Sequence, residues 1–223
     1  MKKSKTLFTL LLAGALIASC GGAKEGNEGG KDNTKTAQRP LTVAMATEID
    51  SLDPFNATAG DTKTVMDQIF DGLLDVDEDG NLVPDLAESY EISEDGLTYT
   101  FKLKEGVKFH DGSDFTADDV YYTYDKLSGL SSGEPMSSKF SVIKEMEVVS
   151  PTEITMTLDA VNNSFIYLQN QPIVKKDYED NQTKPVGTGP YKFVSYTPGE
   201  GMAMERFDDY HRKHHIAKIK QVN

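Results

Sequence analysis

The chain has 223 residues, of which 38% are hydrophobic and 26% charged, with ten tyrosines and ten phenylalanines. This content is sufficient for a packed core in one large or two small domains. The formal net charge of −13 is uneven, because residues 1–40 carry +4 and the remainder carries −17. An acidic body repels phosphates, so the charge argues against a nucleic-acid partner; an acidic surface that aids solubility is the simpler interpretation.

The first 40 residues predict export and attachment to a membrane. Three lysines among the first five residues precede a twelve-residue apolar stretch, 7–18, that is too short to span a bilayer. The sequence Ile-Ala-Ser-Cys then ends at Cys20, the single cysteine, and resembles a bacterial lipobox. We expect a signal peptide over residues 1–19 and a lipid on Cys20; an ordinary signal peptide with an incidental cysteine is the alternative. The glycine-rich polar segment 20–40 predicts a flexible tether.

The body opens with an alternating stretch, residues 41–46, which predicts a first strand. Pro54 ends this region, because it forces the preceding residue out of the helical conformation. A helix capped by Asp61 or Thr64 is expected next, since apolar residues recur at helical spacing: Val65, Ile69, Phe70, Leu73 and Leu74.

Residues 75–81 begin like a calcium loop, with acidic residues at the first, third and fifth positions and a glycine at the sixth. Leu86 stands where such a loop needs its glutamate ligand, and Pro84 would break the helix that should follow. We therefore predict a hairpin turn at Asp79-Gly80.

The longest coherent pattern covers residues 84–127 and predicts two strands followed by a helix. Asp95-Gly96 and Asp111-Gly112 are typical of turns. Four apolar side chains alternate along the second strand: Leu97, Tyr99, Phe101 and Leu103. Thr116 is expected to cap the helix with Asp119 as its capping-box partner. The helix has one apolar face, formed by Val120, Tyr121, Tyr124 and Leu127.

Two later stretches resemble motifs that carry chemistry. Residues 129–133 match the G-x-S-x-G pattern of a nucleophile elbow around Ser131, but that motif requires a preceding strand and a following helix. Here a helix precedes it, so we do not expect a nucleophile. The glycines in 187–190 suggest a phosphate loop, but a strand follows them; a close approach of two backbones is the better interpretation.

The remaining elements are expected to be a hairpin over 143–158, a short helix containing Phe165, a hairpin over 191–207 and a last strand over 216–222. His211, His214 and His215 lie within five residues and could bind a metal. We expect an exposed, solvated turn there instead, and no metal site. His110 is interpreted as a structural residue at a turn.

The order of these motifs resembles one family. PDLAESY, DGLTYTFKLKEGVKFHDG and FTADDVYYTYDKL follow one another within residues 84–127 as they do in the bacterial extracellular solute-binding proteins of family 5, which serve peptide and nickel ABC transporters. SLDPFN at 51–56, IFDGLL at 69–74 and PVGTGPYKF at 185–193 fit the same order. The resemblance covers residues 41–223, and the motifs are specific together, although each alone would be weak.

The resemblance implies an α/β fold with mixed sheets, periplasmic-binding-protein-like. Residues 41–223 would form the first lobe, truncated, with an inserted subdomain and with the second lobe absent. It also implies a monomer that captures oligopeptides outside the cytoplasmic membrane, facing the periplasm or the cell exterior. Such a protein is anchored by its lipid and delivers its solute to ABC permease subunits, with no catalysis and no cofactor.

The resemblance places ligand contacts in two loops. The first comprises Thr58, Ala59, Gly60 and Asp61, and the second contributes Met136 and Phe140. Thr58 stands where oligopeptide binders commonly have an acidic residue, so nickel or another solute remains an alternative ligand.

Three other hypotheses compete with transport. An exported enzyme would need a nucleophile with a base or an open metal site, and the sequence shows no H-E-x-x-H motif and no properly placed nucleophile. A surface lipoprotein without transport activity remains open. A decayed or artificially cut product would expose the apolar side of an unfinished lobe and tend to aggregate.

Overall fold

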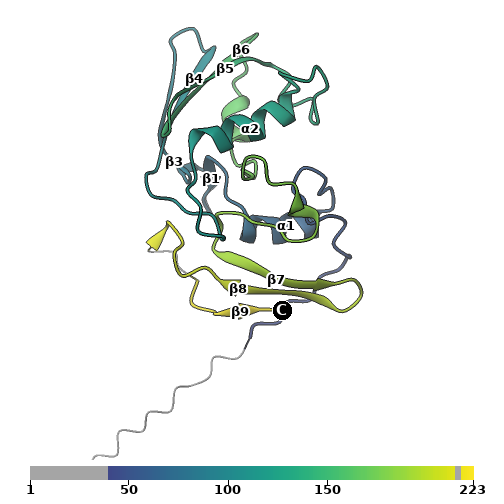
Figure 1. Ribbon diagram of the computed structural model, residues 1–223. Helices are drawn as coiled ribbons and strands as arrows, with labels where there is room; N and C mark the ends of the chain where they lie inside the picture. Colours follow the sequence, from purple (N-terminus) through teal and green to yellow (C-terminus); the bar gives the residue numbers. More distant parts are fainter. Residues whose placement is uncertain (1–39, 214–216) are drawn as a thin grey trace, which may run out of the picture. The chain divides into compact units, whose positions relative to one another are not determined.

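The computed structural model describes residues 40–213 and 217–223 (Figure 1). Cys20, the expected signal peptide and the expected tether lie outside these residues, as do His214 and His215. The elements in chain order are α1 (Gly60–Ile69), β1 (Leu74–Val76), β2 (Leu82–Pro84), β3 (Ala87–Ile92), β4 (Thr98–Leu103), α2 (Ala117–Ser128), β5 (Ile143–Ser150), β6 (Glu153–Leu158), the 3-10 helices η1 (Phe165–Leu168) and η2 (Asp180–Gln182), β7 (Tyr191–Thr197), β8 (Gly201–Arg206) and β9 (Gln221–Val222). In this described part, no helix has the length and apolar character needed to cross a membrane. The expected mixture of helices and several sheets is confirmed.

One antiparallel sheet, in the order β3-β4-β6-β5, packs against α2 (Figure 1). Tyr99, Phe101 and Leu103 on β4 are buried, as their alternation predicts. They meet the apolar face of α2, where Val120 and Tyr124 are fully buried. The pattern over residues 84–127 therefore specifies half of this core by itself.

The capping box predicted at the start of α2 is present. The Thr116 N–H donates to Asp119 Oδ2 (2.8 Å), and Thr116 has the extended backbone of an N-cap residue. Asp119 Oδ1 also accepts from the Lys176 N–H (2.8 Å), so the same carboxylate ties a distant segment to the helix. Gly129 ends the helix in the left-handed conformation.

A second antiparallel sheet, in the order β7-β8-β9, lies beside α1 (Figure 1). Its core contains Met66 and Ile69 from the helix and Met202 and Met204 from β8. The first strand expected over 41–46 is reduced to a single parallel bridge between Leu41 and Val222. The last strand is likewise shorter than expected, because β9 contains two residues.

The helix α1 is shorter than the spacing of apolar residues predicts. It begins at Gly60, one residue before the expected cap, and ends at Ile69, so Leu73 and Leu74 lie beyond it. After the helix, at Gly72, the chain passes close to another segment, because a Cβ at this position would lie 2.7 Å from the backbone of Asn170.

The hairpin predicted at Asp79-Gly80 is confirmed and joins β1 to β2. Asp77 Oδ1 accepts from the N–H groups of Asp79 (3.0 Å) and Asn81 (2.8 Å), and Gly80 has a φ of 83°. Asp77 thus organises the turn through hydrogen bonds to the turn backbone.

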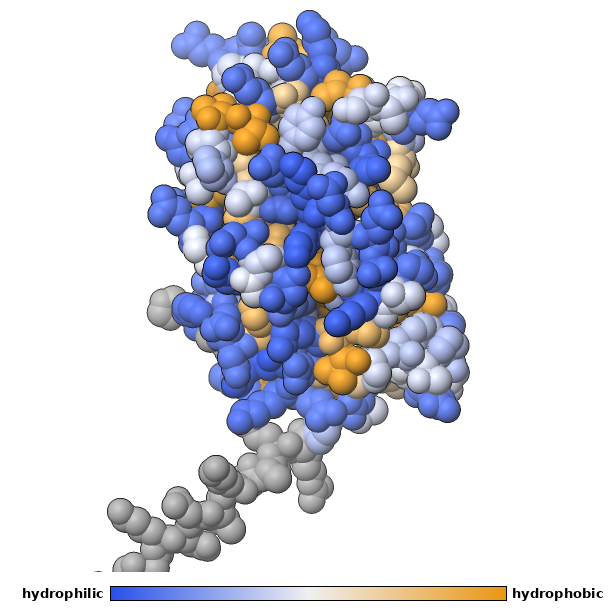
Figure 2. Space-filling model, in the orientation of Figure 1, coloured by the Kyte–Doolittle hydropathy of each residue, from blue (hydrophilic) through white to orange (hydrophobic). Residues whose placement is uncertain are grey.

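Figure 2 shows one face of the protein, which is mostly hydrophilic with small separate apolar patches, in keeping with the acidic composition.

Candidate functional site

The first loop expected to contact a ligand is organised by Asp50. One oxygen of this carboxylate, Oδ2, accepts from the N–H groups of Thr58 and Ala59 (both 2.9 Å) and from the Thr58 hydroxyl. The hydroxyl of Thr58 and these neighbouring donors hold the pKa of Asp50 well below its usual range. The loop is therefore held in one conformation by an acidic residue that sequence reasoning did not single out.

Asp61, at the first turn of α1, is likewise engaged by its own chain. Its Oδ2 accepts from the N–H groups of Ala46 (3.0 Å) and Thr47 (2.9 Å) and from the Thr47 hydroxyl (3.0 Å). The Thr47 hydrogen bonds lower the pKa of Asp61. The first turn of α1 has no side-chain cap, and Gly60 is exposed. The N–H groups of Thr58 and Ala59 and the carboxylate of Asp61 are thus engaged by the protein itself, and the uncapped first turn of α1 is the part that presents backbone amides.

The second expected loop exposes one of its two predicted contact residues and buries the other. Met136 is 51% exposed, and its N–H donates to Lys126 O (3.3 Å). Phe140 is only 2% exposed, and its ring packs edge-on against those of Tyr124 and Phe165. Phe140 is a core residue, so a ligand on this surface would meet Met136 instead. No hydrogen bond between described residues joins this loop to Thr58–Asp61.

The G-x-S-x-G stretch forms no nucleophile elbow. It follows α2, and Gly129 lies so close to the next loop that a Cβ would be 2.4 Å from Pro135 N. The Ser131 N–H donates to Asp125 Oδ1 (2.9 Å), which makes the stretch a helix-terminating turn.

The structural interpretations of His110 and of the glycines at 187–190 are confirmed. His110 Nε2 lies 2.9 Å from Gly189 O, and the Gly187 N–H donates to His110 Nδ1 (3.3 Å). Burial lowers the pKa of His110 to about 4, so the ring is neutral at pH 7. A Cβ at Gly187 would lie 2.0 Å from Ile69 O, which is the predicted close approach of backbones.

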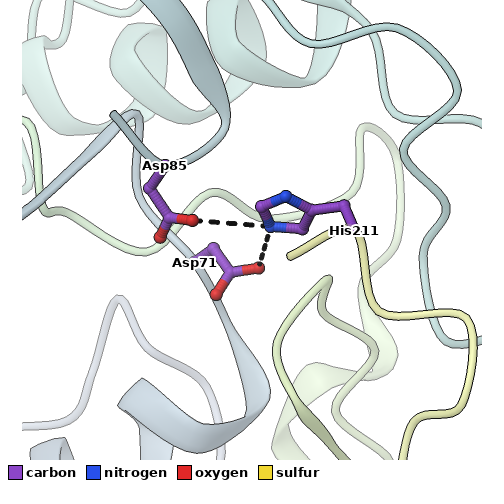
Figure 3. A group of neighbouring side chains, drawn as sticks. All are labelled: Asp71, Asp85 and His211. Atoms are coloured by element: carbon purple, nitrogen blue, oxygen red, sulfur yellow. Dashed lines mark hydrogen bonds and ion pairs between the residues drawn. The ribbon is translucent and has the colours of Figure 1, made fainter. Parts of the chain in front are cut away.

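A cluster of titratable side chains lies elsewhere, around His211 (Figure 3). His211 Nε2 is 3.1 Å from Asp71 Oδ2 and 3.4 Å from Asp85 Oδ1. The side chains of all three residues are 5–6% exposed. The expectation of an exposed turn is therefore wrong for His211, because its Nε2 edge is buried against two carboxylates.

Two further residues complete the surroundings of this cluster. The Tyr210 hydroxyl donates to Asp71 Oδ1 (3.3 Å). Arg212 Nη1 donates to Asp75 Oδ2 (2.8 Å) and lies 3.6 Å from Asp85 Oδ1. Burial, assisted by the charge of Asp71, raises the pKa of Asp85 to about 8.

The spacing of residues along the chain could not reveal this cluster, because Asp71 and His211 are 140 residues apart. One signal was nevertheless available. Asp71 follows Phe70, and Asp85 precedes Leu86, within otherwise apolar surroundings. A carboxylate in a core segment needs a positively charged or hydrogen-bonding partner, and the adjacent residues His211 and Arg212 can supply one once the chain is folded.

Comparison with known proteins identifies the family. Residues 81–223 match the model for bacterial extracellular solute-binding proteins, family 5 Middle. The chain belongs to this family. Among curated relatives, the glutathione-binding protein GsiB of Pectobacterium atrosepticum is 34% identical over 182 residues, which cover 78% of this chain and 35% of the relative.

Solved structures agree with this assignment. NikZ from Campylobacter jejuni, in complex with Ni(L-His), has a TM-score of 0.71 and 28% identity over 82% of this chain and 38% of its own. The periplasmic binding protein DppA from Helicobacter pylori, in complex with the peptide STSA, has a TM-score of 0.74 and 27% identity over 82% of this chain and 42% of its own. The chain thus spans about two fifths of the length of these proteins.

Proposed function

We propose that this chain supplies one wall of the ligand cleft in a substrate-binding lipoprotein of an ABC transporter. The protein captures oligopeptides outside the cytoplasmic membrane, is anchored through a lipid on Cys20 and passes its ligand to permease subunits. Membership of family 5 supports this proposal, as do the peptide bound to DppA and the ligand named for GsiB.

The observation that carries the peptide assignment is the hydrogen bonding of the Thr58–Asp61 loop. Asp50 binds the Thr58 and Ala59 N–H groups, Asp61 binds that of Thr47, and the uncapped first turn of α1 presents the amides that remain. Backbone groups recognise the main chain that all peptides share, which gives affinity without dependence on side-chain sequence. A fixed loop also lowers the entropy lost on binding.

The test is a calorimetric titration of the full protein with di-, tetra- and nonapeptides, with glutathione and with nickel-histidine. Peptides of unrelated sequence are expected to bind with similar affinity. Replacing Asp50 with alanine releases the loop and is expected to weaken peptide binding by about tenfold or more, since each lost contact of this kind is worth about 1 kcal/mol.

A matched control is Asp77→Ala, which removes a carboxylate that organises the β1–β2 turn in the same way. It is expected to leave peptide affinity unchanged. The proposal fails if nickel-histidine binds while no peptide does, or if Asp50→Ala and Asp77→Ala have equal effects. Incorporation of labelled fatty acid by the wild type but not by Cys20→Ser tests the lipid anchor separately.

A further inference from the structure

The buried cluster around His211 brings three ligand atoms to one point. Asp71 follows α1, Asp85 lies between β2 and β3, and His211 follows β8. One ligand atom from each residue lies within 4.8 Å of the others. Figure 3 shows both carboxylates on the Nε2 edge of the imidazole, while the second ring nitrogen points away from them. Two carboxylates and one histidine form a ligand set that suits zinc and similar divalent ions.

Two distances in the cluster are close to those between the ligands of one metal ion. Ligands about 2.0–2.2 Å from a tetrahedral zinc ion lie about 3.3–3.6 Å from each other. His211 Nε2 is 3.1 Å from Asp71 Oδ2 and 3.4 Å from Asp85 Oδ1. Both distances lie within a few tenths of an ångström of that range, and one ligand atom from each of the three residues lies within 4.8 Å of the others.

Two buried polar atoms of the cluster lack hydrogen-bond partners within the described part of the chain: Asp85 Oδ1 and His211 Nδ1. The Asp85 side chain is 95% buried, and Oδ1 is the oxygen that faces His211. Burying a carboxylate oxygen without a hydrogen bond is costly. A cation bound between Asp85 and His211 would satisfy this oxygen directly.

The charges around the site leave room for a divalent cation. Arg212 is engaged by Asp75 at 2.8 Å and approaches Asp85 only to 3.6 Å. Lys104 is a further positive neighbour, and burial lowers its pKa. Arg212 is thus shared between Asp75 and Asp85, and His211 is the group that contacts both Asp71 and Asp85.

The outer contacts and the access route also suit a metal. Tyr210 donates to Asp71 Oδ1, which leaves Oδ2 directed at His211. Such outer hydrogen bonds orient metal ligands. His211 also lines a cavity of about 630 Å³, together with Lys104, Glu88 and Thr152, through which an ion and a water ligand could enter.

We propose that Asp71, Asp85 and His211 bind a divalent transition-metal ion of the zinc type, with water completing the coordination. The ion would join the segment after β8 to the segments that flank the β1–β2 hairpin. This structural metal site is separate from the Thr58–Asp61 loop, so it can be present or absent whatever ligand the cleft binds.

The test is a titration of metal-free protein with Zn²⁺ in competition with a chromophoric chelator. Full-length protein with Cys20→Ser, His214→Ala and His215→Ala is used, because these substitutions remove a thiol and two imidazoles that could bind zinc on their own. One Zn²⁺ per chain is expected to bind and to raise the melting temperature. Co²⁺ is expected to give the visible absorption of a low-symmetry, four-coordinate site.

Asp85→Asn in the same background is the decisive variant, since it keeps the shape of the side chain. Loss of a residue that hydrogen-bonds to a metal ligand weakens metal binding by roughly 10–100-fold. Loss of the ligand Asp85 itself is expected to weaken Zn²⁺ binding by at least as much. The matched control is Asp77→Asn, which alters an acidic residue outside the cluster and is expected to leave zinc affinity unchanged. If Asp85→Asn fails to fold, His211→Gln replaces it. Absence of zinc binding, or equal binding by the variant and the control, would overturn the proposal.

Discussion

Replacing Gly187 with alanine tests how closely the chain before β7 packs against the end of α1. The added Cβ would lie 2.0 Å from Ile69 O and 2.8 Å from a ring carbon of Phe70. Two hydrogen bonds hold this contact: Gly189 N–H donates to Ile69 O, and His110 N–H donates to Gly187 O, both at 2.9 Å. The obstacle is backbone, so relief requires a movement that strains or breaks these bonds.

The size of the effect follows from those contacts. Overpacking costs about 1–3 kcal/mol, and a buried backbone group that loses its partner costs about 1–3 kcal/mol more. We therefore expect the free energy of unfolding to fall by about 2–6 kcal/mol, a large share of the roughly 5–15 kcal/mol typical of a domain. The melting temperature should fall by about 4–24 °C, since about 2–4 °C corresponds to 1 kcal/mol in a chain of this size.

The assay is urea and thermal unfolding followed by circular dichroism. Gly60→Ala is the control, because nothing lies within 4 Å of the Cβ that it adds. That change is expected to be neutral or stabilising by up to about 1 kcal/mol. A loss below about 1 kcal/mol for Gly187→Ala, measured beside this control, would refute the close approach of the two backbones.

Two further predictions concern buried polar groups. Tyr124→Phe should lower the free energy of unfolding by about 1–3 kcal/mol, because the Tyr124 hydroxyl donates to the buried Gln169 Oε1 (2.7 Å); denaturant titration beside the exposed Tyr167→Phe, expected within about 0.5 kcal/mol of wild type, checks this. For His110, burial lowers the pKa from 6.5 to about 4, so the unfolded state takes up the proton first and stability falls as pH drops from 6.5 to 4. The difference in stability between wild type and His110→Gln should change by up to about 3 kcal/mol across that window, and a flat difference would contradict the assignment.

The α2 unit was predictable from sequence because its determinants are local. A capping box at Thr116 and Asp119, alternation along β4 and turns at Asp-Gly pairs each act over a few residues. The same holds for the β1–β2 and β7–β8 hairpins. Where neighbours in the sequence decide the conformation, the pattern of residue types carries most of the information.

The end of α1 was not predictable in this way. Leu73 and Leu74 continue the helical spacing, yet they are buried outside the helix. Gly72 lies against Asn170 at a distance that only a glycine allows. This contact joins residues 98 positions apart, so hydrophobic periodicity around α1 could not predict the path of the chain here.

In the candidate ligand loops, too, position along the chain was predictable, but conformation and burial were not. The resemblance to family 5 indicates where the Thr58–Asp61 loop lies in the chain, but not that Asp50 fixes its conformation. Phe140 is predicted to contact a ligand, yet its buried ring packs with those of Tyr124 and Phe165. Burial of a single residue in a loop depends on which surface that loop covers.

The His211 cluster contains both kinds of feature, those that the local sequence predicts and those that only tertiary structure determines. Nothing local marks His211 for burial, since its neighbours in the sequence are charged or polar. The two acidic residues, in contrast, are marked: each is attached to a core segment, and each must find positive charge, a proton or a metal there. The local sequence thus predicts that Asp71 and Asp85 need a partner, while tertiary structure determines which residue or ion that partner is. Substituting the acidic residues one at a time and measuring zinc affinity separates a metal from a proton, because a protonated Asp85 needs no ion and its replacement by asparagine would then change nothing.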